Sequence, residues 1–332
     1  MFERVPIAAT LILITTIASA HHSNSAFDLD RMIAFQGTVV RYQWRNPHVY
    51  LVIKDADDIE WTIETGATSI MSRSGWTRDS FAEGDSVSLR ANPDKKSSKR
   101  HALLLSIEGP GGVPMASMNR TGRSNVSNET VIATSLAGIW TTDRTYALPF
   151  MRSLREHPLT KKGQAARAQF DEGMNPTIDC IPWPTPFIMA SNGLYLNEVE
   201  LRDDVIFIRS EFYNAQRTVY LDGRGHPEDG ERTIQGHSIG WWENDTLVVD
   251  TTLFADHRQP TPNTGIPSGA EKHVVERLTL SEDGSQVLIE ILVNDPEYLA
   301  APVTAEFAWA YAPHLEMLAV DCDPDVARRF LQ

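Results

Sequence analysis

Short stretches in which apolar and polar residues alternate recur along most of the chain. An alternation with a period of two residues is typical of half-buried β-strands. Turn residues such as Asn244-Asp245 and Asp283-Gly284 separate these stretches, as they do between antiparallel strands joined by hairpins. The pattern predicts an all-β chain, and its 332 residues exceed the usual size of one domain.

The first residues form a predicted secretory signal. An apolar run from Val5 to Ile17 precedes Ala18-Ser19-Ala20, small residues of the kind that a signal peptidase reads. The run is shorter than the roughly 20 apolar residues of a membrane-spanning helix, and we expect no membrane span. We predict a signal peptide over 1–20, a first domain over 21–108, a linker over 109–135 and a second domain over 136–332. The mature protein is expected in the periplasm or secreted.

Five strands are predicted in the first domain, over 33–44, 48–54, 60–64, 85–91 and 102–107. A short segment that suits a helix, 67–73, lies between the third and the fourth strand. That order is typical of a five-stranded OB-type barrel. Nucleic-acid binding does not follow, because the domain has no concentrated basic face and the whole chain has a formal charge of −14.

The second domain is predicted to be a larger barrel with one short helix. The helix is expected over 159–171, with Thr160 as its N-cap. Strands are expected over 205–212, 217–222, 237–242, 246–254, 273–280, 286–293, 305–311 and 317–321. Eight or more short antiparallel strands indicate an up-and-down barrel.

The two cysteines, Cys180 and Cys322, both fall in the second domain. In an oxidising compartment such a pair is expected to form a disulfide rather than to include a catalytic thiol. The bond would tie the proline-rich segment 180–186 to the last predicted strand.

The second domain opens with Gly138-Ile139-Trp140. This tripeptide, at the first strand of an all-β domain, resembles the G-x-W signature of lipocalin-type barrels. The resemblance implies a barrel that encloses small apolar molecules, with Trp140 closing one end.

Two further resemblances cover much of the chain. The first domain resembles an uncharacterised family of exported bacterial proteins that start with His-His-Ser and carry a Trp-x-Asn-Pro-His motif, here at 21–23 and 44–48. The second half resembles another recurrent exported segment, here over 220–227, 236–240 and 245–251. Neither resemblance implies a settled activity.

One candidate metal site lies at the mature N-terminus. Cleavage after Ala20 would expose the α-amine and imidazole of His21, which together can chelate copper(II) in a nitrogen-rich site. His48 or His101 would supply the further imidazole. In the alternative interpretation His21 is simply exposed, and His48, which follows Pro47, belongs to a rigid corner between two strands.

Carboxylates interrupt the apolar faces of strands in the second domain. Glu276 shares a face with Val274 and Leu278, and Asp250 shares one with Val248. One face of each strand in a small barrel points into the lumen, where a carboxylate is costly unless it is paired. Arg217 or Arg209 could pair with Glu276, whereas Arg277 should face the opposite way.

His237 is the candidate for acid–base chemistry. It lies between two small residues, just before Trp241-Trp242, and at a barrel mouth it could exchange protons with an enclosed ligand. Asp250 or Glu211 across the lumen would complete a set suited to an isomerase, a hydratase or a cyclase. The alternative is a histidine that only bonds a loop carbonyl.

We therefore predict an exported protein whose second barrel binds a small, largely apolar molecule without a resident cofactor. A proton-transfer enzyme and a copper-handling protein are the alternatives, and the first domain would serve as a docking module. The residues expected to line or close the pocket, or to supply its polar contacts, are Trp140, Phe207, Arg217, Trp241, Trp242 and Glu276, with His237 and Asp250.

Overall fold

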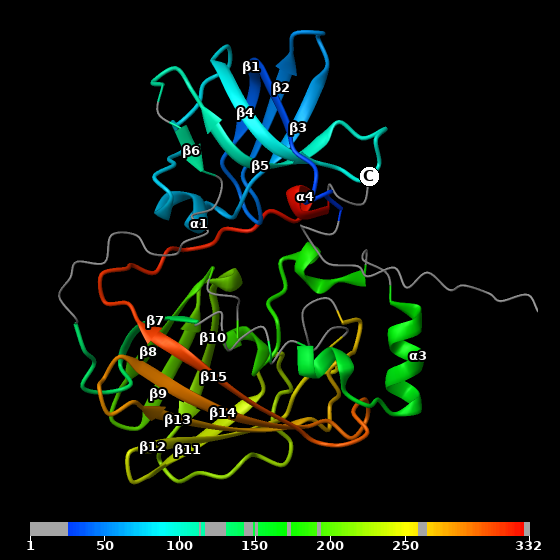
Figure 1. Cartoon of the computed structure of the whole chain (residues 1–332). Helices are drawn as coiled ribbons and strands as arrows, with labels where there is room; N and C mark the ends of the chain where they lie inside the picture. Colours follow the sequence, from blue (N-terminus) through cyan, green and yellow to red (C-terminus); the bar gives the residue numbers. More distant parts are fainter. Residues whose placement is uncertain are drawn as a thin grey trace, which may run out of the picture.

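Two β-barrels follow one another along the chain (Figure 1). The structure is a computed structural model that describes residues 26–112, 114–116, 131–142, 149, 152–170, 174–190, 194–257 and 264–328. The predicted signal peptide and His21 lie outside these residues. No helix in the described part is long and apolar enough to cross a membrane.

The first barrel has five strands. They are β1 (Ile33–Gln43), β2 (Tyr50–Asp55), β3 (Glu60–Glu64), β4 (Ser86–Pro93) and β5 (His101–Glu108). The hydrogen-bonded order is β3-β2-β1-β4-β5, and a parallel pairing of β3 with β5 closes the sheet. Helix α1 (Thr68–Arg73) lies between β3 and β4, which is the chain order expected from the sequence. Trp76, Leu51 and Ile63 are among the residues of the apolar core.

The second barrel has nine strands and is closed. They are β7 (Gly138–Thr142), β8 (Leu196–Leu201), β9 (Val205–Ser210), β10 (Ala215–Tyr220), β11 (His237–Glu243), β12 (Thr246–Thr252), β13 (His273–Leu280), β14 (Gln286–Asn294) and β15 (Val303–Tyr311). The last strand pairs with the first, β15 with β7, so that no edge stays open. The prediction of an all-β chain with a small and a larger barrel is confirmed.

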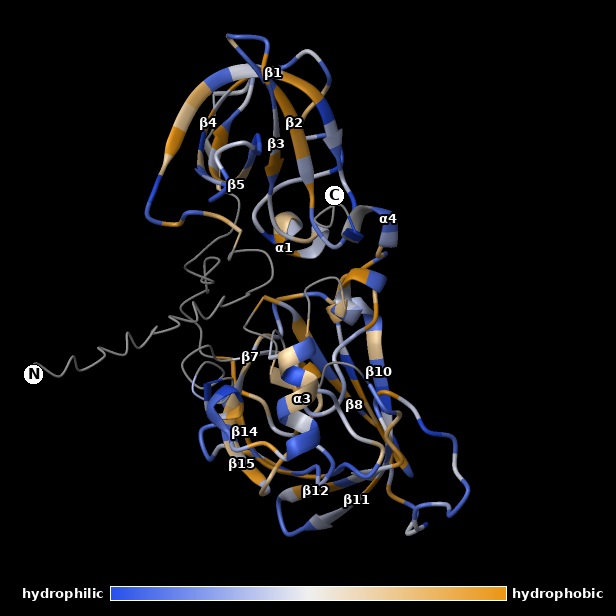
Figure 2. Cartoon of the chain, turned by 90° about the vertical axis from the view of Figure 1, so that its right-hand side faces the viewer, coloured by the Kyte–Doolittle hydropathy of each residue, from blue (hydrophilic) through white to orange (hydrophobic). Residues whose placement is uncertain are grey.

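Side chains fill the interior of the larger barrel. Apolar residues alternate along its strands (Figure 2), and those that point inward are buried. Segment η3 (Phe187–Ala190) also lies inside, where the carbonyl oxygen of Met189 accepts hydrogen bonds from Trp309 Nε1 at 2.9 Å and from Thr142 Oγ1 at 3.1 Å. The barrel is therefore packed rather than hollow.

Helix α3 (Lys161–Gln169) packs beside the larger barrel. Its N-cap is Thr160, as predicted, and the Thr160 hydroxyl accepts a bond from the Gly163 N–H at 3.0 Å. Gly163 permits close packing, because a Cβ atom there would lie 2.3 Å from the carbonyl oxygen of Tyr298. The helix start is thus held against the turn that follows β14.

Three details differ from the sequence prediction. Residues 317–321 form no strand, because their backbone bonds side chains: Val320 N–H donates to Asn214 Oδ1 at 2.8 Å. The β10–β11 pair is parallel, because the long connection 221–236 carries the chain back to the same end. Strand β6 (Pro114–Ala116), within the predicted linker, pairs with β5.

The C-terminal segment runs back to the first barrel (Figure 1). The predicted disulfide between Cys180 and Cys322 is present and ties this segment to η2 (Pro176–Asp179). Beyond it, Asp323 N–H donates to the Asn46 carbonyl at 3.2 Å, and Arg45 forms an ion pair with Asp323 at 2.7 Å. Two residues of the Trp-x-Asn-Pro-His motif thus contact the second half of the chain.

Glu211 is the second tie between the barrels. Its carboxylate is fully buried and accepts hydrogen bonds from the Leu196 N–H at 3.0 Å and from the Leu318 N–H at 2.8 Å. It also forms an ion pair with Arg73 of α1. The Glu211 carboxylate therefore contacts three parts of the chain: the larger barrel, the C-terminal segment and the first barrel.

We expect Glu211→Gln to lower the free energy of unfolding by about 1–3 kcal/mol, because the partly buried Arg73 guanidinium loses its counter-charge. Urea unfolding followed by tryptophan fluorescence measures the change. Glu198→Gln is the matched control: Glu198 pairs with Arg209 at the half-exposed barrel surface, where such a pair contributes about 0–1 kcal/mol. Equal effects of the two substitutions would refute the role given to Glu211.

Candidate functional site

A buried ion pair lies inside the nine-stranded barrel. Arg217 of β10 and Glu276 of β13 both point inward, and Arg217 Nη1 lies 2.5 Å from Glu276 Oε2. Strand alternation allowed this pair and excluded Arg277, which faces outward and pairs with Glu243. The pair lies in the barrel interior, as we expected because Glu276 shares a strand face with the apolar residues Val274 and Leu278.

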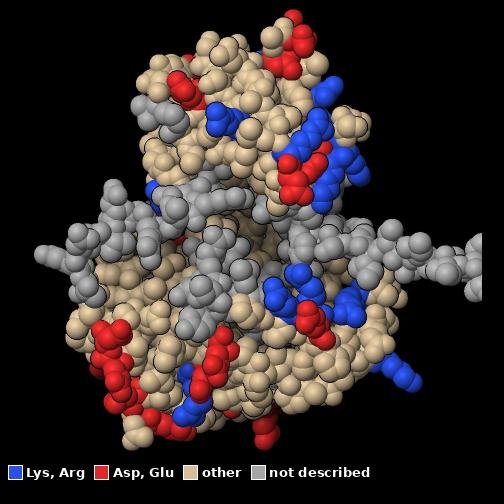
Figure 3. Space-filling model, in the orientation of Figure 1, with Lys and Arg blue, Asp and Glu red and all other residues tan. Residues whose placement is uncertain are grey.

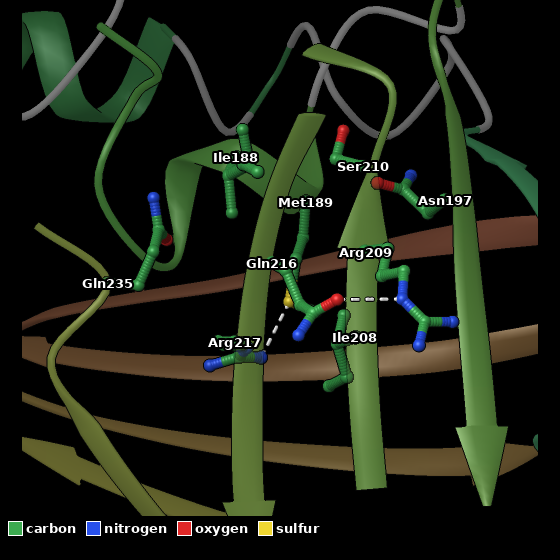
Figure 4. Close-up of a pocket in the computed structure, with 10 residues that line it drawn as sticks. Ile188, Met189, Asn197, Ile208, Arg209, Ser210, Gln216, Arg217 and Gln235 are labelled. Carbon is green, nitrogen blue, oxygen red and sulfur yellow. Dashed lines mark hydrogen bonds between the residues drawn. The ribbon is translucent and has the colours of Figure 1, made fainter. Parts of the chain in front are cut away.

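Arg217 also contacts η3. Its Nη2 donates to Met189 Sδ at 2.7 Å (Figure 4). Arg217 Nε and Glu276 Oε1 have no hydrogen-bond partner among the residues that the structure describes. A small pocket adjoins the arginine, with about 200 Å³ of unfilled space that includes part of the solvent; it is lined by Ile188, Met189, Asn197, Ile208, Arg209, Ser210, Ala215, Gln216, Arg217 and Gln235.

Lys272 is a second buried cation, one residue before β13. Its side chain points inward like that of Val274, and the residue is only 2% exposed. The Nζ donates to the Thr185 carbonyl at 2.8 Å and lies 3.9 Å from the ring centre of Phe254. Burial lowers the pKa of Lys272 to about 7, although the nearby carboxylates of Asp295 and Glu276 act in the opposite direction.

Asp295 lies across the sheet from Lys272. His273 of β13 pairs with Asn294 of β14 in antiparallel register. Lys272 and Asp295 are the next residues on either strand and are therefore neighbours. Asp295 Oδ2 accepts a bond from the Gly269 N–H at 2.8 Å, whereas Oδ1, also buried, has no partner in the described part of the chain. Burial raises the pKa of Asp295.

Lys272 and Asp295 line one pocket at this end of the barrel. The other residues of its wall are apolar: Leu154, Phe187, Ile266, Pro267, Val293 and Leu299. The unfilled space is about 290 Å³, including the part that is open to solvent. Apolar walls with a few polar groups are the usual composition of a small-molecule site, but this pocket is narrow.

His237 and Asp250 lie on the outer face of the barrel. His226 joins them: its Nδ1 lies 2.8 Å from His237 Nδ1, and its Nε2 lies 2.9 Å from Asp250 Oδ1. His273 Nε2 is 2.7 Å from Asp250 Oδ2. The four side chains form a hydrogen-bonded row, which we call the histidine row.

The expectation that His237 and Asp250 share the barrel lumen is therefore wrong. Alternation placed Asp250 correctly with Val248, but both face outward, and the inward residues of β12 are Leu247, Val249 and Thr251. Glu211 is not a partner of His237 either, because Glu211 lies between β9 and the start of β10, whereas His237 lies beside the far end of β10. Burial lowers the pKa of His237, with help from the His226 and Arg224 charges.

The predicted aromatic wall is largely absent from the lumen. Phe207 faces outward between the guanidinium groups of Arg202 and Arg209, 4.7 and 5.3 Å from its ring centre. Trp241 and Trp242 are 42% and 45% exposed. Trp140 points inward, is fully buried, and packs on Tyr311 at a ring-centre distance of 4.9 Å.

Two of the predicted metal ligands flank a buried carboxylate in the first barrel. His48 Nδ1 lies 2.8 Å from Glu64 Oε1, and His101 Nε2 lies 3.2 Å from Glu64 Oε2. Asp94 lies on the far side of His101, 3.7 Å from its Nδ1. In the described part of the chain, no group of three or more His, Cys, Asp or Glu side chains is arranged to hold a metal ion. A copper site is thus not supported, and His21 itself lies outside that part.

Charge pairing outweighs burial in this cluster. Burial alone would lower the pKa of His48, but the Glu64 carboxylate and the Thr65 carbonyl raise it above 6.5 overall. Burial alone would raise the pKa of Glu64, but His48 and His101 lower it below 4.5 overall. The pairing thus favours the ionised form of Glu64 and the protonated form of His48 inside the first barrel.

Five residues of these clusters were not predicted from the sequence: Lys272, Asp295, Glu64, His226 and His273. Lys272 stands between Glu271 and His273, a polar run that is typical of a solvated turn. Only its position indicated burial: Lys272 lies an even number of residues before Val274 and Glu276, so all three side chains share the inward face. Nothing comparable marks His226, which lies in the irregular connection between β10 and β11.

Arg217→Met should lower the free energy of unfolding by about 3–5 kcal/mol, because it leaves the Glu276 charge buried and unpaired. The double variant Arg217→Met with Glu276→Leu should recover most of that loss, since it removes both charges. Guanidinium unfolding of the three proteins measures the difference. If the double variant is as unstable as Arg217→Met, the unpaired Glu276 charge is not the cause of the loss.

The first barrel should be most stable between about pH 4.5 and 6.5. The raised pKa of His48 contributes stability that is present below 6.5 and is lost as the pH rises through the folded value. The lowered pKa of Glu64 contributes stability that is present above 4.5 and is lost as the pH falls. Thermal unfolding by circular dichroism across this range measures the profile.

Glu64→Gln should remove the loss of stability that sets in above pH 6.5, because His48 then has no carboxylate beside it. His157→Gln is the control, since His157 bonds only a carbonyl of the second barrel among the contacts found, at 2.8 Å. If both variants keep the slope of the parent protein, the Glu64 cluster does not cause it.

Residues 9–103 match a family of unknown function, DUF6152. No curated protein matches this chain. Among solved structures, the fluorescent protein UnaG is similar in its wild-type crystal structure, with 11% identity and a TM-score of 0.26 over 53% of this chain and 96% of UnaG. A mutant of UnaG gives 12% identity and the same TM-score over 53% of this chain and 95% of that chain. The family match thus ends within β5, and the nine-stranded barrel lies outside it.

Proposed function

We propose that the nine-stranded barrel binds a small, largely apolar molecule in the pocket that Lys272 and Asp295 line. The observation that carries the proposal is the composition of this pocket. Six apolar side chains form most of its wall, and one amine and one carboxyl group supply its polar contacts. A ligand of this class gains from burial in such a wall, about 25 cal/mol per Å² of apolar surface.

The interior polarity sets the kind of ligand. Arg217, Glu276, Lys272 and Asp295 are two cations and two carboxylates within one barrel interior, so the site carries little net charge. A neutral molecule with one polar end therefore suits the pocket better than a strong anion, for which the interior offers no net positive charge.

Export is part of the proposal. The sequence over 1–20 has the pattern of a secretory signal. The disulfide between Cys180 and Cys322 is consistent with an oxidising compartment such as the periplasm or the medium. We assign the first barrel a docking role, because its contacts with the rest of the chain are held through Arg45, Asn46 and Arg73.

A proton-transfer enzyme that uses His237 in the lumen finds no support, since His237 and Asp250 face outward. Trp140 and Glu276 remain proposed contributors to the barrel interior, although neither lines the two pockets described. The pocket near Lys272 therefore replaces the histidine as the centre of the proposed function.

Titration of the purified full-length protein with N-phenyl-1-naphthylamine tests this. This neutral, apolar probe becomes fluorescent when it is shielded from water, and we expect saturable binding of one probe per chain. Val293→Phe, which fills the pocket, should weaken binding at least about tenfold, the factor that 1.4 kcal/mol corresponds to.

Leu292→Phe is the matched control. Leu292 is the preceding residue of β14, lies on its outer face and is 41% exposed, so the same side chain there should leave binding unchanged. Leu299→Phe is a second pocket-filling variant in case the first one misfolds. Equal binding to the pocket-filling variants and the control would place the probe on the surface and refute the pocket.

A further inference from the structure

The position of the Lys272 amine is unusual for a lysine. The side chain is buried, and its hydrogen-bond partner is the neutral carbonyl oxygen of Thr185 rather than a carboxylate. Two aromatic rings flank Nζ, with centres at 3.9 Å for Phe254 and 5.8 Å for Phe187. The amine is therefore held in one place at the pocket wall, where water is largely excluded.

Asp295 offers a proton-carrying group in the same pocket. One of its oxygens is fixed by the Gly269 N–H, and the other is buried without a partner in the described part of the chain. A buried, unpartnered carboxyl oxygen costs free energy unless a proton or a ligand satisfies it. This oxygen thus points to a function beyond packing.

The protonation states fit the geometry. Burial lowers the pKa of Lys272 to about 7, so a large share of the amine is neutral near neutral pH. Burial also raises the pKa of Asp295, which favours its protonated form. A neutral lysine amine is a nucleophile towards carbonyl carbon, whereas an ammonium group is not.

We propose that Lys272 binds apolar aldehydes or ketones covalently, as an imine, with Asp295 carrying the protons of the reaction. This inference rests on the proposed function, because it uses the same pocket. In this proposal the polar end of the ligand is a carbonyl group.

The reaction balances without a further reactant. The Nζ lone pair forms a bond to the carbonyl carbon, and one of the two Nζ protons passes by way of Asp295 to the oxygen to give a carbinolamine. The carboxyl group of Asp295 then protonates the hydroxyl, which leaves as water while the nitrogen forms the double bond. The proton that the nitrogen loses returns to the Asp295 carboxylate, so that one amine and one carbonyl give one imine and one water.

Cinnamaldehyde, an apolar aromatic aldehyde, is the probe for this test. The full-length protein is incubated with it in the presence of cyanoborohydride, which reduces an imine to a stable secondary amine. Intact mass spectrometry should show one added probe per chain, and peptide mapping should place it on Lys272. The labelling rate should rise with pH and level off above about 7, where the amine is neutral.

Lys272→Arg should abolish this label, because a guanidinium group is not a nucleophile towards carbonyl carbon. Lys162→Arg is the matched control: Lys162 is half exposed and paired with Glu297 at 2.6 Å, and its loss should leave the label intact. Lys272→Met serves as a second variant if arginine does not fit. Asp295→Asn should slow labelling while N-phenyl-1-naphthylamine still binds.

The test separates this inference from the proposed function. Saturable binding of N-phenyl-1-naphthylamine together with labelling that Lys272→Arg does not reduce would overturn the imine and leave the pocket standing. Failure of both probes would overturn the pocket itself. Labelling of Lys272 that the naphthylamine blocks would support both.

Discussion

Two cations and two carboxylates inside the nine-stranded barrel constrain the rest of that domain. Arg217 pairs with Glu276 at 2.5 Å, and Lys272 and Asp295 lie at the neighbouring end of the same sheet. Charges that leave water cost several kcal/mol each unless opposite charges compensate them. The strand register and the position of η3 must therefore bring these groups together. Arg217 lines one of the two pockets described above, and Lys272 and Asp295 line the other.

Much of the architecture could be predicted from local pattern. The strands β3 and β13 begin and end where alternation and turn residues placed them, because one face of each must be buried. Thr160 caps α3 as its side chain chemistry requires. The pairing of Cys180 with Cys322 followed from there being two cysteines, and the partner of Glu276 followed from which arginines share its face.

The candidate site was harder to predict, for physical reasons. Alternation tells which residues share a face but not which face is the lumen, and this is why Asp250 and His237 were placed on the wrong side. Lys272 is polar and stands between polar residues, so composition marks it as solvated, and only tertiary packing against Phe254 and Thr185 buries it. The role of Glu211 depends on Arg73, which is 138 residues away in sequence, a contact that no local pattern encodes.

The central claim is that Lys272 is a buried amine with a lowered pKa inside a ligand pocket. A pH titration of the lysine side chains by NMR, with the Lys272 signal assigned from the spectrum of Lys272→Arg, tests it most directly. The account predicts that one lysine titrates near pH 7, whereas the others titrate near 10.4 or, for Lys162 beside Glu297, above it. If the Lys272 signal titrates with the others, the amine is solvated and protonated at neutral pH, and the account of the site is contradicted.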